Sequence, residues 1–283
     1  MKRGALIAAG ITAALGVAGP ASADSMPRPG GLDFLPPATR MMQQIEAFHN
    51  FLLPIIIAVS VLVLALLLWV MVRYNRRANP TPRKFTHNLT VEVIWTIVPV
   101  AILVVIAYGS FPLIYAQERV PPAELTLKVT GNSWFWTYEY PDLGVQINSN
   151  LLPEEEARAS GRPWLLATTE PLLVPVDTTV RVLVTSNDVI HAFAVPAFGV
   201  KEDAIQGRVN ETWFRVDSEL IGEQESFYGQ CSELCGLNHA YMPIEIRVVS
   251  REEFDQWVAA QGGTLAAETT PEGQGARAET PTR

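Results

Sequence analysis

The chain has 283 residues, which allows one or two domains with attached segments. Its 29 acidic residues outnumber its 21 Lys and Arg residues, giving a formal net charge of −8. A chain with this balance has little to attract the phosphate backbone of a nucleic acid, so we expect no nucleic-acid partner.

The first element is a short apolar run behind two basic residues. Residues 1–23 read MKRGALIAAGITAALGVAGPASA and end in the small-residue pattern Ala21-Ser22-Ala23. This pattern predicts a secretory signal peptide that is removed after Ala23. A first membrane anchor is the alternative, but the run is short and is interrupted by two glycines and a proline.

Two long uncharged stretches follow and predict a helical membrane hairpin within residues 24–119. Phe51–Val72 would be about 33 Å long as a helix, enough to cross the hydrocarbon core of a bilayer. Val93–Tyr115 contains two prolines, which membrane helices tolerate better than soluble ones. We expect helices at about 48–73 and 91–115. Two buried helices of a soluble protein are the alternative, but such helices rarely lack charge on every face.

The loop between these stretches predicts the orientation. Residues 73–90 hold five basic residues and no acid. The positive-inside rule places such a short loop in the cytoplasm. Both termini, and everything after about residue 116, would then lie on the periplasmic side of a bacterial inner membrane, in agreement with the signal peptide.

The rest of the chain predicts an all-β domain over 120–260. Residues 251–260 carry the first helical pattern after the hairpin, and 154–164 is predicted as an inserted surface loop with a helical turn. The polar, Gly/Pro/Thr-rich residues 261–283 predict a disordered tail. A compact β-barrel or sandwich is expected, because several stretches rich in Val, Ile, Leu and Thr end at turn-forming residues: 124–131, 172–188 and 243–250.

This outer domain is strongly acidic. From Val120 onward the chain has 24 Asp and Glu against 11 Lys and Arg. Ordinary solubility explains such an excess. An acidic docking surface for a cationic partner explains it too. Such a surface would speed association, and this effect would weaken as the salt concentration rises. Charge alone does not decide between these interpretations.

The chemistry of the chain is concentrated in GQCSELCGLNHAYMP, residues 229–243. This stretch contains both cysteines, Cys231 and Cys235, followed by His239 and Met242. A periplasmic disulfide would explain the cysteines but not the other two residues. The C-x3-C spacing does not fit a C-x-x-C redox motif, and thioether sulfur is a poor zinc ligand. Thiolate, imidazole and thioether together form the soft donor set that selects copper.

A second imidazole is available, and His191 is the best placed. His49 and His87 lie at the ends of the predicted membrane helices, whereas His191 follows a strand that ends near Asn187. Blue-copper sites combine an early histidine with a late loop of Cys, His and Met. Two thiolates and two imidazoles exceed what one blue copper needs. They suit two copper ions that share both sulfurs, each capped by one histidine, with the thiols deprotonated on binding.

Motifs spread over most of the chain carry a resemblance to a known family. The chain resembles subunit II of the haem-copper cytochrome c oxidases, which bear a dicopper centre called CuA. A C-x3-C motif alone would be weak support, but together the matching stretches are highly specific: VEVIWTIVP (91–99), WFWTYEY (134–140), DVIHAF (188–193), PAFGVKEDAIQGR (196–208) and GQCSELCGLNHAYMP (229–243).

The resemblance implies a fold and a set of ligands. The outer domain would be a cupredoxin, a Greek-key β-barrel, carried on the two-helix hairpin. Two cysteines would bridge both copper ions, one histidine with a methionine would complete one ion, and the other histidine with a backbone carbonyl would complete the second. In that order, these ligands would be Cys231 and Cys235, His191 and Met242, and His239 and Glu233.

The resemblance also implies partners and further roles. The subunit would accept electrons from cytochrome c and pass them to haem in the catalytic subunit, where oxygen is reduced to water and protons are pumped. Electrons would enter at Trp134, which without the resemblance would be interpreted as a core tryptophan. The Glu233 side chain would point to a magnesium ion shared with the catalytic subunit. Glu92 would sit at the mouth of a proton path; its alternative role is a favourable interaction with the helix N-terminus.

The chain departs from the family pattern at a few positions. Gln206 stands where Pro is usual, Phe193 where Trp is common, and Ser133 where Gln is common. None of these residues is an implied ligand. The departures therefore bear on docking and on the copper potential and not on copper binding.

Two other functions are compatible with a soft metal site. A nitric oxide or nitrous oxide reductase component can carry a similar centre, although the nitrous oxide enzyme has a much longer soluble chain. A membrane-anchored copper carrier is the second alternative, but it needs open, exchangeable coordination, whereas six donors around two ions indicate permanence. Quinol oxidases share the hairpin and barrel but lack the ligand set.

Overall fold

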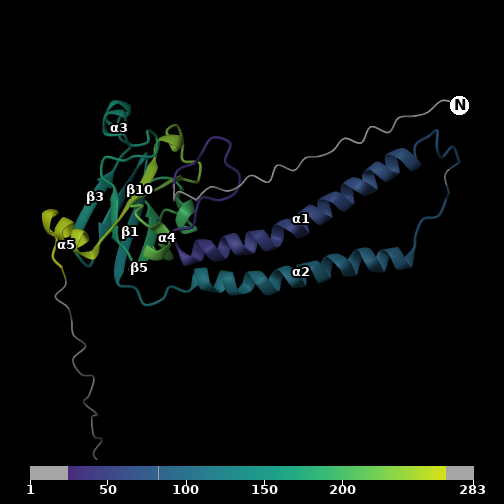
Figure 1. The fold of residues 1–283 in the computed structure, drawn as a ribbon, viewed down its shortest axis with the longest axis horizontal. Helices are drawn as coiled ribbons and strands as arrows, with labels where there is room; N and C mark the ends of the chain where they lie inside the picture. Colours follow the sequence, from purple (N-terminus) through teal and green to yellow (C-terminus); the bar gives the residue numbers. More distant parts are fainter. Residues whose placement is uncertain (1–24, 82, 266–283) are drawn as a thin grey trace, which may run out of the picture.

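The structure is a computed structural model that describes residues 25–81 and 83–265. The predicted signal peptide, 1–23, and the predicted tail beyond residue 265 lie outside the described residues. Two long helices run side by side and extend from one end of a β-domain (Figure 1). This arrangement confirms the predicted helical hairpin followed by an all-β domain.

Both helices of the hairpin are long enough and apolar enough to cross a membrane. Helix α1 spans Arg40–Arg73 and helix α2 spans Leu89–Glu118. No side chain in the most apolar part of either helix is buried within the protein. Helices that are apolar on every face yet uncovered need lipid or partner helices around them.

Helix α1 starts at Arg40 rather than near residue 48, because the β-domain sets its beginning. The side chain of Thr39 accepts a hydrogen bond from the Met42 backbone N–H at 3.0 Å and so caps the helix. The same hydroxyl donates to the carbonyl of Phe198 at 2.8 Å. The residues before the apolar run are therefore helical through a tertiary contact, which a hydropathy pattern does not reveal.

Helix α2 is capped at one end and tied to the β-domain at the other. The Asn88 side chain accepts from the Val91 N–H at 3.3 Å, and the Asn88 N–H donates to the Glu92 carboxylate at 2.9 Å. Near the end of the helix, Trp213 Nε1 donates to the carbonyl of Ala116 at 3.2 Å. Both helices are thus joined to the domain at the same end of the hairpin.

The strands of the described residues form two five-stranded sheets, ordered β3-β2-β1-β5-β8 and β4-β10-β9-β6-β7. β1 pairs with β5 and β4 with β10 in parallel, and the other neighbours are antiparallel. The inward side chains of both sheets meet in one core. The bounds are β1 Leu125–Asn132, β2 Phe135–Tyr140, β3 Val145–Ser149, β4 Leu172–Pro175, β5 Thr179–Ser186, β6 His191–Val195, β7 Val200–Ala204, β8 Asn210–Arg215, β9 Ser226–Cys231 and β10 Pro243–Val249.

One predicted strand is divided in two. The stretch 172–188 forms β4 and β5, separated by a turn at Asp177, whose φ is 55°. β4 pairs with β10 in one sheet and β5 pairs with β1 in the other. The chain changes sheets at this turn. Both halves are apolar, so the composition of this stretch is the same as that of a single strand.

The predicted surface insertion is anchored to the core by an ion pair with a buried carboxylate. Helix α3, Glu154–Ser160, occupies part of this loop. Beyond it, Arg162 forms an ion pair with Glu245 of β10, whose side chain is buried. The Thr168 N–H also donates to the Glu245 carboxylate, at 2.7 Å. The domain ends in helix α5, Arg251–Ala260, which matches the predicted helical pattern.

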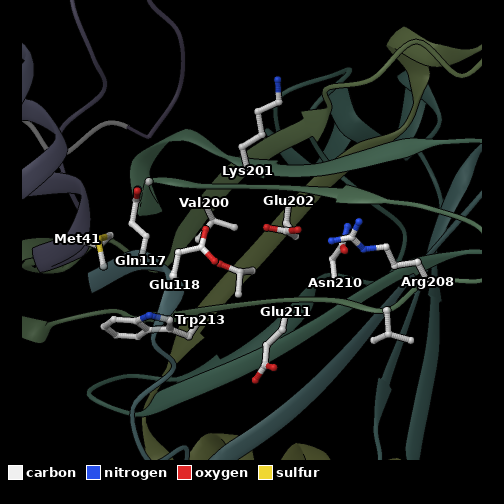
Figure 2. A pocket seen from close by; sticks show the side chains of 13 residues that line it. Met41, Gln117, Glu118, Val200, Lys201, Glu202, Arg208, Asn210, Glu211 and Trp213 are labelled. Carbon is white, nitrogen blue, oxygen red and sulfur yellow. The ribbon is translucent and has the colours of Figure 1, made fainter. Parts of the chain in front are cut away.

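A polar cavity of about 460 Å³ lies where the hairpin meets the β-domain (Figure 2). Glu118 from α2, Glu202 from β7 and Arg208 from the β7–β8 loop line it. Burial, followed by the charges of Asp203 and Glu118, raises the pKa of Glu202. The junction between hairpin and domain is therefore charged rather than apolar.

Candidate metal centre

The sheet that contains β6 and β9 brings the first two candidate ligands together. His191 is the first residue of β6, and Cys231 is the last residue of β9. The antiparallel register of these strands places Phe193 opposite Cys231. His191, two positions from Phe193, shares its face of the strand. The His191 side chain is fully buried.

The other candidates come from the loop between β9 and β10. The Cys231 N–H donates to the carbonyl of Met242 at 3.1 Å and closes the base of this loop. A short 3-10 helix, His239–Tyr241, turns His239 toward Cys235. Met242 is buried and directly precedes β10. A chain segment of twelve residues therefore folds back on itself around its own sulfur atoms.

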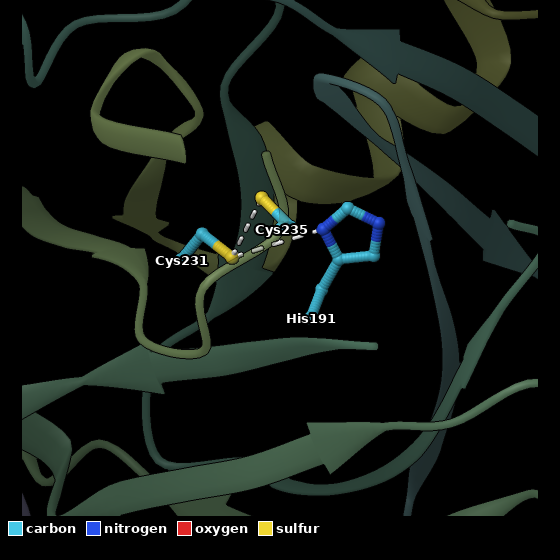
Figure 3. A group of neighbouring side chains, drawn as sticks. All are labelled: His191, Cys231 and Cys235. Carbon is cyan, nitrogen blue, oxygen red and sulfur yellow. Dashed lines mark hydrogen bonds between the residues drawn. The ribbon is translucent and has the colours of Figure 1, made fainter. Parts of the chain in front are cut away.

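The donor atoms lie close together on both sides of the two sulfurs. The ligand atoms of His191, Cys231 and Cys235 all lie within 4.8 Å of one another (Figure 3). The individual separations are 3.8 Å for Cys231 Sγ to Cys235 Sγ, 3.8 Å for Cys231 Sγ to His191 Nδ1, 3.4 Å for Cys231 Sγ to the Glu233 carbonyl oxygen, 3.5 Å for Cys235 Sγ to His239 Nδ1 and 3.8 Å for Cys235 Sγ to Met242 Sδ.

This donor set fits a pair of copper ions. Both cysteines are free, and their sulfurs are much farther apart than the ~2 Å of a disulfide bond. Each sulfur has its own imidazole, so two ions could share both sulfurs and have one histidine each. The buried thioether of Met242 favours copper over zinc as the metal.

The two thiols differ in acidity. Burial alone would raise the pKa of Cys231, but hydrogen bonds with His191 and with the backbone lower it to about 6. Burial, together with the adjacent charge on Cys231, raises the pKa of Cys235 to about 12. Without metal, the pair therefore carries one negative charge at neutral pH, centred on Cys231.

The indole of Trp134 is attached directly to this loop. Its Nε1 donates to the backbone carbonyl of Cys235 at 3.0 Å. Its ring packs over Gly236, where an added Cβ would lie 3.2 Å from Trp134 Cζ2. Trp134 is half-buried and packs at the margin of the core. A partly exposed aromatic ring is thus hydrogen-bonded to the backbone of a candidate sulfur ligand.

The imidazole of His191 is held between a glycine and a tryptophan. A Cβ at Gly131 of β1 would lie only 2.8 Å from His191 Cδ2. On another side the Trp136 ring meets the imidazole edge-on, with ring centroids 6.0 Å apart. Any side chain at position 131 would displace the imidazole.

The outer nitrogen of His191 has a carboxylate partner. His191 Nε2 lies 2.8 Å from Asp188 Oδ1. Burial acts to raise the pKa of Asp188, but hydrogen bonds from His191, Val189 and Ser133 outweigh it and lower the pKa to about 2. The carboxylate is therefore ionised and accepts a hydrogen bond from the Nε2–H of His191, which leaves the lone pair of Nδ1 free to face the sulfurs.

The two remaining predicted residues lie away from the sulfurs. The Glu233 side chain is exposed and faces a second polar cavity of about 490 Å³, lined also by Lys201, Asp203 and Arg208. Glu92 is in the first turn of α2, at the end of the hairpin opposite the β-domain (Figure 1). Its contact with the Asn88 N–H is the helix-capping interaction that was the alternative to a proton role.

Asp188 and Gly131 are parts of the site that sequence reasoning missed. Asp188 precedes His191 by three residues at the end of a strand, a spacing from which a turn lets a carboxylate reach an imidazole. That spacing was a usable signal. Gly131 gave no such signal, because its role depends on the parallel pairing of β1 with β5 and on the position of β6.

Fold and site together define a class: a membrane-anchored, two-pass protein whose β-domain carries a soft-metal centre of Cys and His. Comparison with known proteins gives the family. Residues 125–249 match the model of the cytochrome c oxidase subunit II periplasmic domain, and residues 27–113 match that of the subunit II transmembrane domain. The chain belongs to the cytochrome c oxidase subunit II family.

Two related sequences agree with this assignment. The chain is 45% identical over 243 residues to a probable cytochrome c oxidase subunit 2 of Rickettsia bellii, covering 86% of this chain and 88% of the relative. It is 44% identical over 256 residues to cytochrome c oxidase subunit 2 of Cereibacter sphaeroides, covering 84% and 83%. A crystal structure of the periplasmic domain of subunit II from Bradyrhizobium japonicum is 49% identical, covering 51% of this chain and 97% of that one, with a TM-score of 0.45.

Membership of this family carries a function. The chain is a subunit of a haem-copper oxidase and associates with its catalytic subunit. The family's CuA-type electron-input role applies to it, and the reductase and copper-carrier alternatives are not favoured.

Proposed function

We propose that six residues of this chain hold the two copper ions of the electron-input centre. The carrying observation is that soft donors from β6 and from the β9–β10 loop converge on two free sulfurs. When bound, copper supplies a carrier that takes up and gives up one electron at a time. The ligands are His191, Cys231, Glu233 through its backbone carbonyl, Cys235, His239 and Met242.

The protein's own part is to bind and shield this centre. Cys231 is already a thiolate at neutral pH, so it can act as the first sulfur ligand without a separate deprotonation step. Cys235 loses its proton when metal binds, because a coordinating thiol is deprotonated outright. The burial of His191 and Met242 keeps water away and limits how far the surroundings reorganise.

Trp134 is proposed as the point where electrons enter from cytochrome c. Its half-exposed ring offers a flat surface to a donor, and its Nε1–H is bonded to the Cys235 carbonyl. This bond is a short connection between the surface and a sulfur ligand. The acidic excess of the outer domain would attract a cationic cytochrome and guide it toward this ring.

Glu233 is proposed to serve both metals of the complex. Its carbonyl faces Cys231 Sγ at 3.4 Å, while its carboxylate is exposed and borders a polar cavity. A carboxylate pointing away from the sulfurs suits a hard cation such as magnesium shared with the catalytic subunit. Electrons would then leave toward haem on the side of the domain that meets that subunit.

Glu92 is proposed to stand at the mouth of a proton path into the catalytic subunit. It is half-buried in the first turn of α2, at the end of the hairpin remote from the domain. An ionisable residue at a membrane boundary that faces a partner is often functional. Its capping contact with Asn88 fixes where the carboxylate sits and leaves its other oxygen available.

The orientation and processing are proposed from the sequence. Signal-peptide removal after Ala23 and the basic loop 73–90 both place the domain 120–260 in the periplasm, with the hairpin segment 24–119 in the bacterial inner membrane. Residues 261–264, which the sequence assigned to the tail, are instead hydrogen-bonded to helix α5 and to Leu143.

Metal analysis and electron spin resonance of the assembled oxidase test the proposal. Two copper ions per copy of this chain and an unpaired electron shared between them are expected. A reductase component would share this signal but not cytochrome c oxidation coupled to oxygen reduction, and a carrier would hold a single exchangeable Cu(I).

A further inference from the structure

One carboxylate connects the two sides of the site. Asp188 Oδ1 lies 2.8 Å from His191 Nε2, and Asp188 Oδ2 accepts a hydrogen bond from the backbone N–H of Ser133 at 2.6 Å. Ser133 immediately precedes Trp134. The same side chain therefore contacts a candidate copper ligand and the strand connection that carries the candidate electron-input tryptophan.

Asp188 is itself held in place by its own turn and by the β7–β8 loop. The Val189 N–H donates to Asp188 Oδ1 at 2.6 Å, and the Asp188 N–H donates to Ser186 Oγ at 3.2 Å. Gln206 Nε2 donates to the Asp188 backbone carbonyl. These bonds hold the Asp188 carboxylate independently of His191 and Ser133. It can therefore determine the positions of those two residues.

We propose that Asp188 is a positioning residue for electron input: it sets the tautomer and direction of His191 and, through Ser133, the position of Trp134. This inference rests on the proposed copper ligation by His191. It gives Asp188 two roles, one toward His191 and one toward Trp134. Neither role follows from the proposed copper ligands or from the acidic charge of the domain.

The effect on His191 follows from hydrogen-bond chemistry. An ionised carboxylate only accepts, so Nε2 carries the proton and Nδ1 presents its lone pair toward Cys231 Sγ. A carboxylate partner also makes the imidazole a stronger donor to the metal. Because oxidised copper is the more positively charged state, stronger donation stabilises it and lowers the reduction potential of the centre.

The effect on Trp134 is geometric. Its ring is fixed at the indole by the Cys235 carbonyl and at the backbone by the Asp188–Ser133 bond. Asn187 Nδ2 also donates to Asn132 Oδ1 at 2.9 Å, so the turn before His191 is hydrogen-bonded to the end of β1 as well as to the β1–β2 connection. Loss of the carboxylate would free one of the two attachments of the tryptophan.

The test compares assembled oxidases carrying Asp188→Asn, Asp188→Ala and the control Asp142→Asn. An asparagine has a single acceptor oxygen, so it cannot serve both His191 and Ser133. Asp142 is exposed in the β2–β3 turn, and its replacement removes the same charge away from the site. The measurements are copper content, midpoint potential, spin-resonance spectrum, the rate of copper reduction by cytochrome c and amide hydrogen exchange at Ser133.

In Asp188→Asn we expect bound copper, a potential shifted to more positive values, an altered spectrum, faster exchange at Ser133 and copper reduction slowed about tenfold, in the range of other outer-sphere partners of metal-bound histidine. Asp188→Ala should show larger changes in the same direction, including partial loss of copper. Asp142→Asn should keep the wild-type potential and spectrum.

A wild-type potential and spectrum in Asp188→Asn would overturn the inference, even if cytochrome binding weakened, because that result would leave Asp188 only a docking charge. A lower melting temperature with unchanged potential would also overturn it. Neither result would touch the copper assignment, which depends on the wild-type spectrum alone.

Discussion

The indole Nε1–H of Trp134 donates to the backbone carbonyl of Cys235 at 3.0 Å, so the aromatic ring at the margin of the domain is hydrogen-bonded to a residue whose sulfur lies at the centre of the candidate metal site. These two residues are about a hundred positions apart in the chain, in the β1–β2 connection and the β9–β10 loop. Their contact directly connects the proposed electron-entry residue to a proposed copper ligand.

Replacing Trp134 by phenylalanine keeps a flat ring but removes this hydrogen bond. We expect copper reduction by cytochrome c to slow while the copper spectrum is retained, and the free energy of unfolding to fall by about 1 kcal/mol for the lost bond. Stopped-flow reduction of the assembled oxidase measures the rate. Trp164→Phe is the control, because that tryptophan lies exposed in the inserted loop. Equal rates in wild type and Trp134→Phe would remove the indole N–H from the route.

Met242 tests the role of the thioether. Its Sδ is 3.8 Å from Cys235 Sγ, and its side chain is buried. Met242→Leu keeps the volume, so we expect a stability cost below about 1.5 kcal/mol and two retained copper ions. The potential should shift and electron transfer should slow, because a weak axial ligand tunes rather than holds the metal.

Potentiometry and metal analysis on the same sample distinguish these effects. Met42→Leu makes the identical change at the buried junction between hairpin and domain and should leave the potential unchanged. Loss of copper from Met242→Leu, with copper retained in Met42→Leu, would show that the thioether is a primary ligand instead.

Gly131 tests the space around His191. In Gly131→Ala the new Cβ would meet the imidazole at 2.8 Å from Cδ2, a distance at which one side must move. We expect reduced copper content and a loss of about 1–3 kcal/mol in the free energy of unfolding, as for other overpacked sites. Atomic absorption and denaturant unfolding measure the two quantities.

Gly144→Ala separates loss of stability from displacement of the ligand. Gly144 has a φ of +68° and no neighbour that an added Cβ would meet. The alanine there stores about 1 kcal/mol of backbone strain far from the sulfurs and should keep full copper content. Full copper in Gly131→Ala would contradict the tight fit of His191.

The sequence predicted the features that arise from residues close together in the chain. The uncharged stretches predicted the hairpin, and the alternating apolar stretches predicted an all-β domain, because both patterns are local. The grouping of Cys231, Cys235, His239 and Met242 is local too, and it predicted the chemistry of the donor set. His191 could be paired with this loop by analogy with blue-copper sites, which share the same order of ligands.

The features that escaped prediction depend on contacts between distant segments. Helix α1 begins at Arg40 because Thr39 bonds to Phe198, and 172–188 is broken at Asp177 because its halves pair in different sheets. The bond between Asp188 and Ser133 joins two loops 55 residues apart. No window of sequence contains these partners together.

The unequal acidity of the two thiols predicts a pH dependence for the metal-free protein. The pKa of Cys231 is lowered to about 6, so its thiolate should be present above that pH and disappear as the pH falls through it. We expect an ultraviolet thiolate absorbance that rises with a midpoint near pH 6 and belongs to one sulfur. Cys235, with a pKa of about 12, should contribute only in strong base.

Cys231→Ser provides the comparison. The step near pH 6 should vanish, and the pKa of Cys235 should fall, because the neighbouring negative charge that raises it is gone. A step near pH 6 that survives in Cys231→Ser would mean that the assignment of the thiolate is wrong.

The most direct test of the copper centre is the number and electronic coupling of metal ions in the assembled oxidase containing this chain. Metal analysis combined with electron spin resonance should find two copper ions at this subunit and one unpaired electron delocalised over both, with the signal lost in Cys231→Ser. A single copper ion with its own localised signal, or a disulfide between Cys231 and Cys235 in the active complex, would contradict the account.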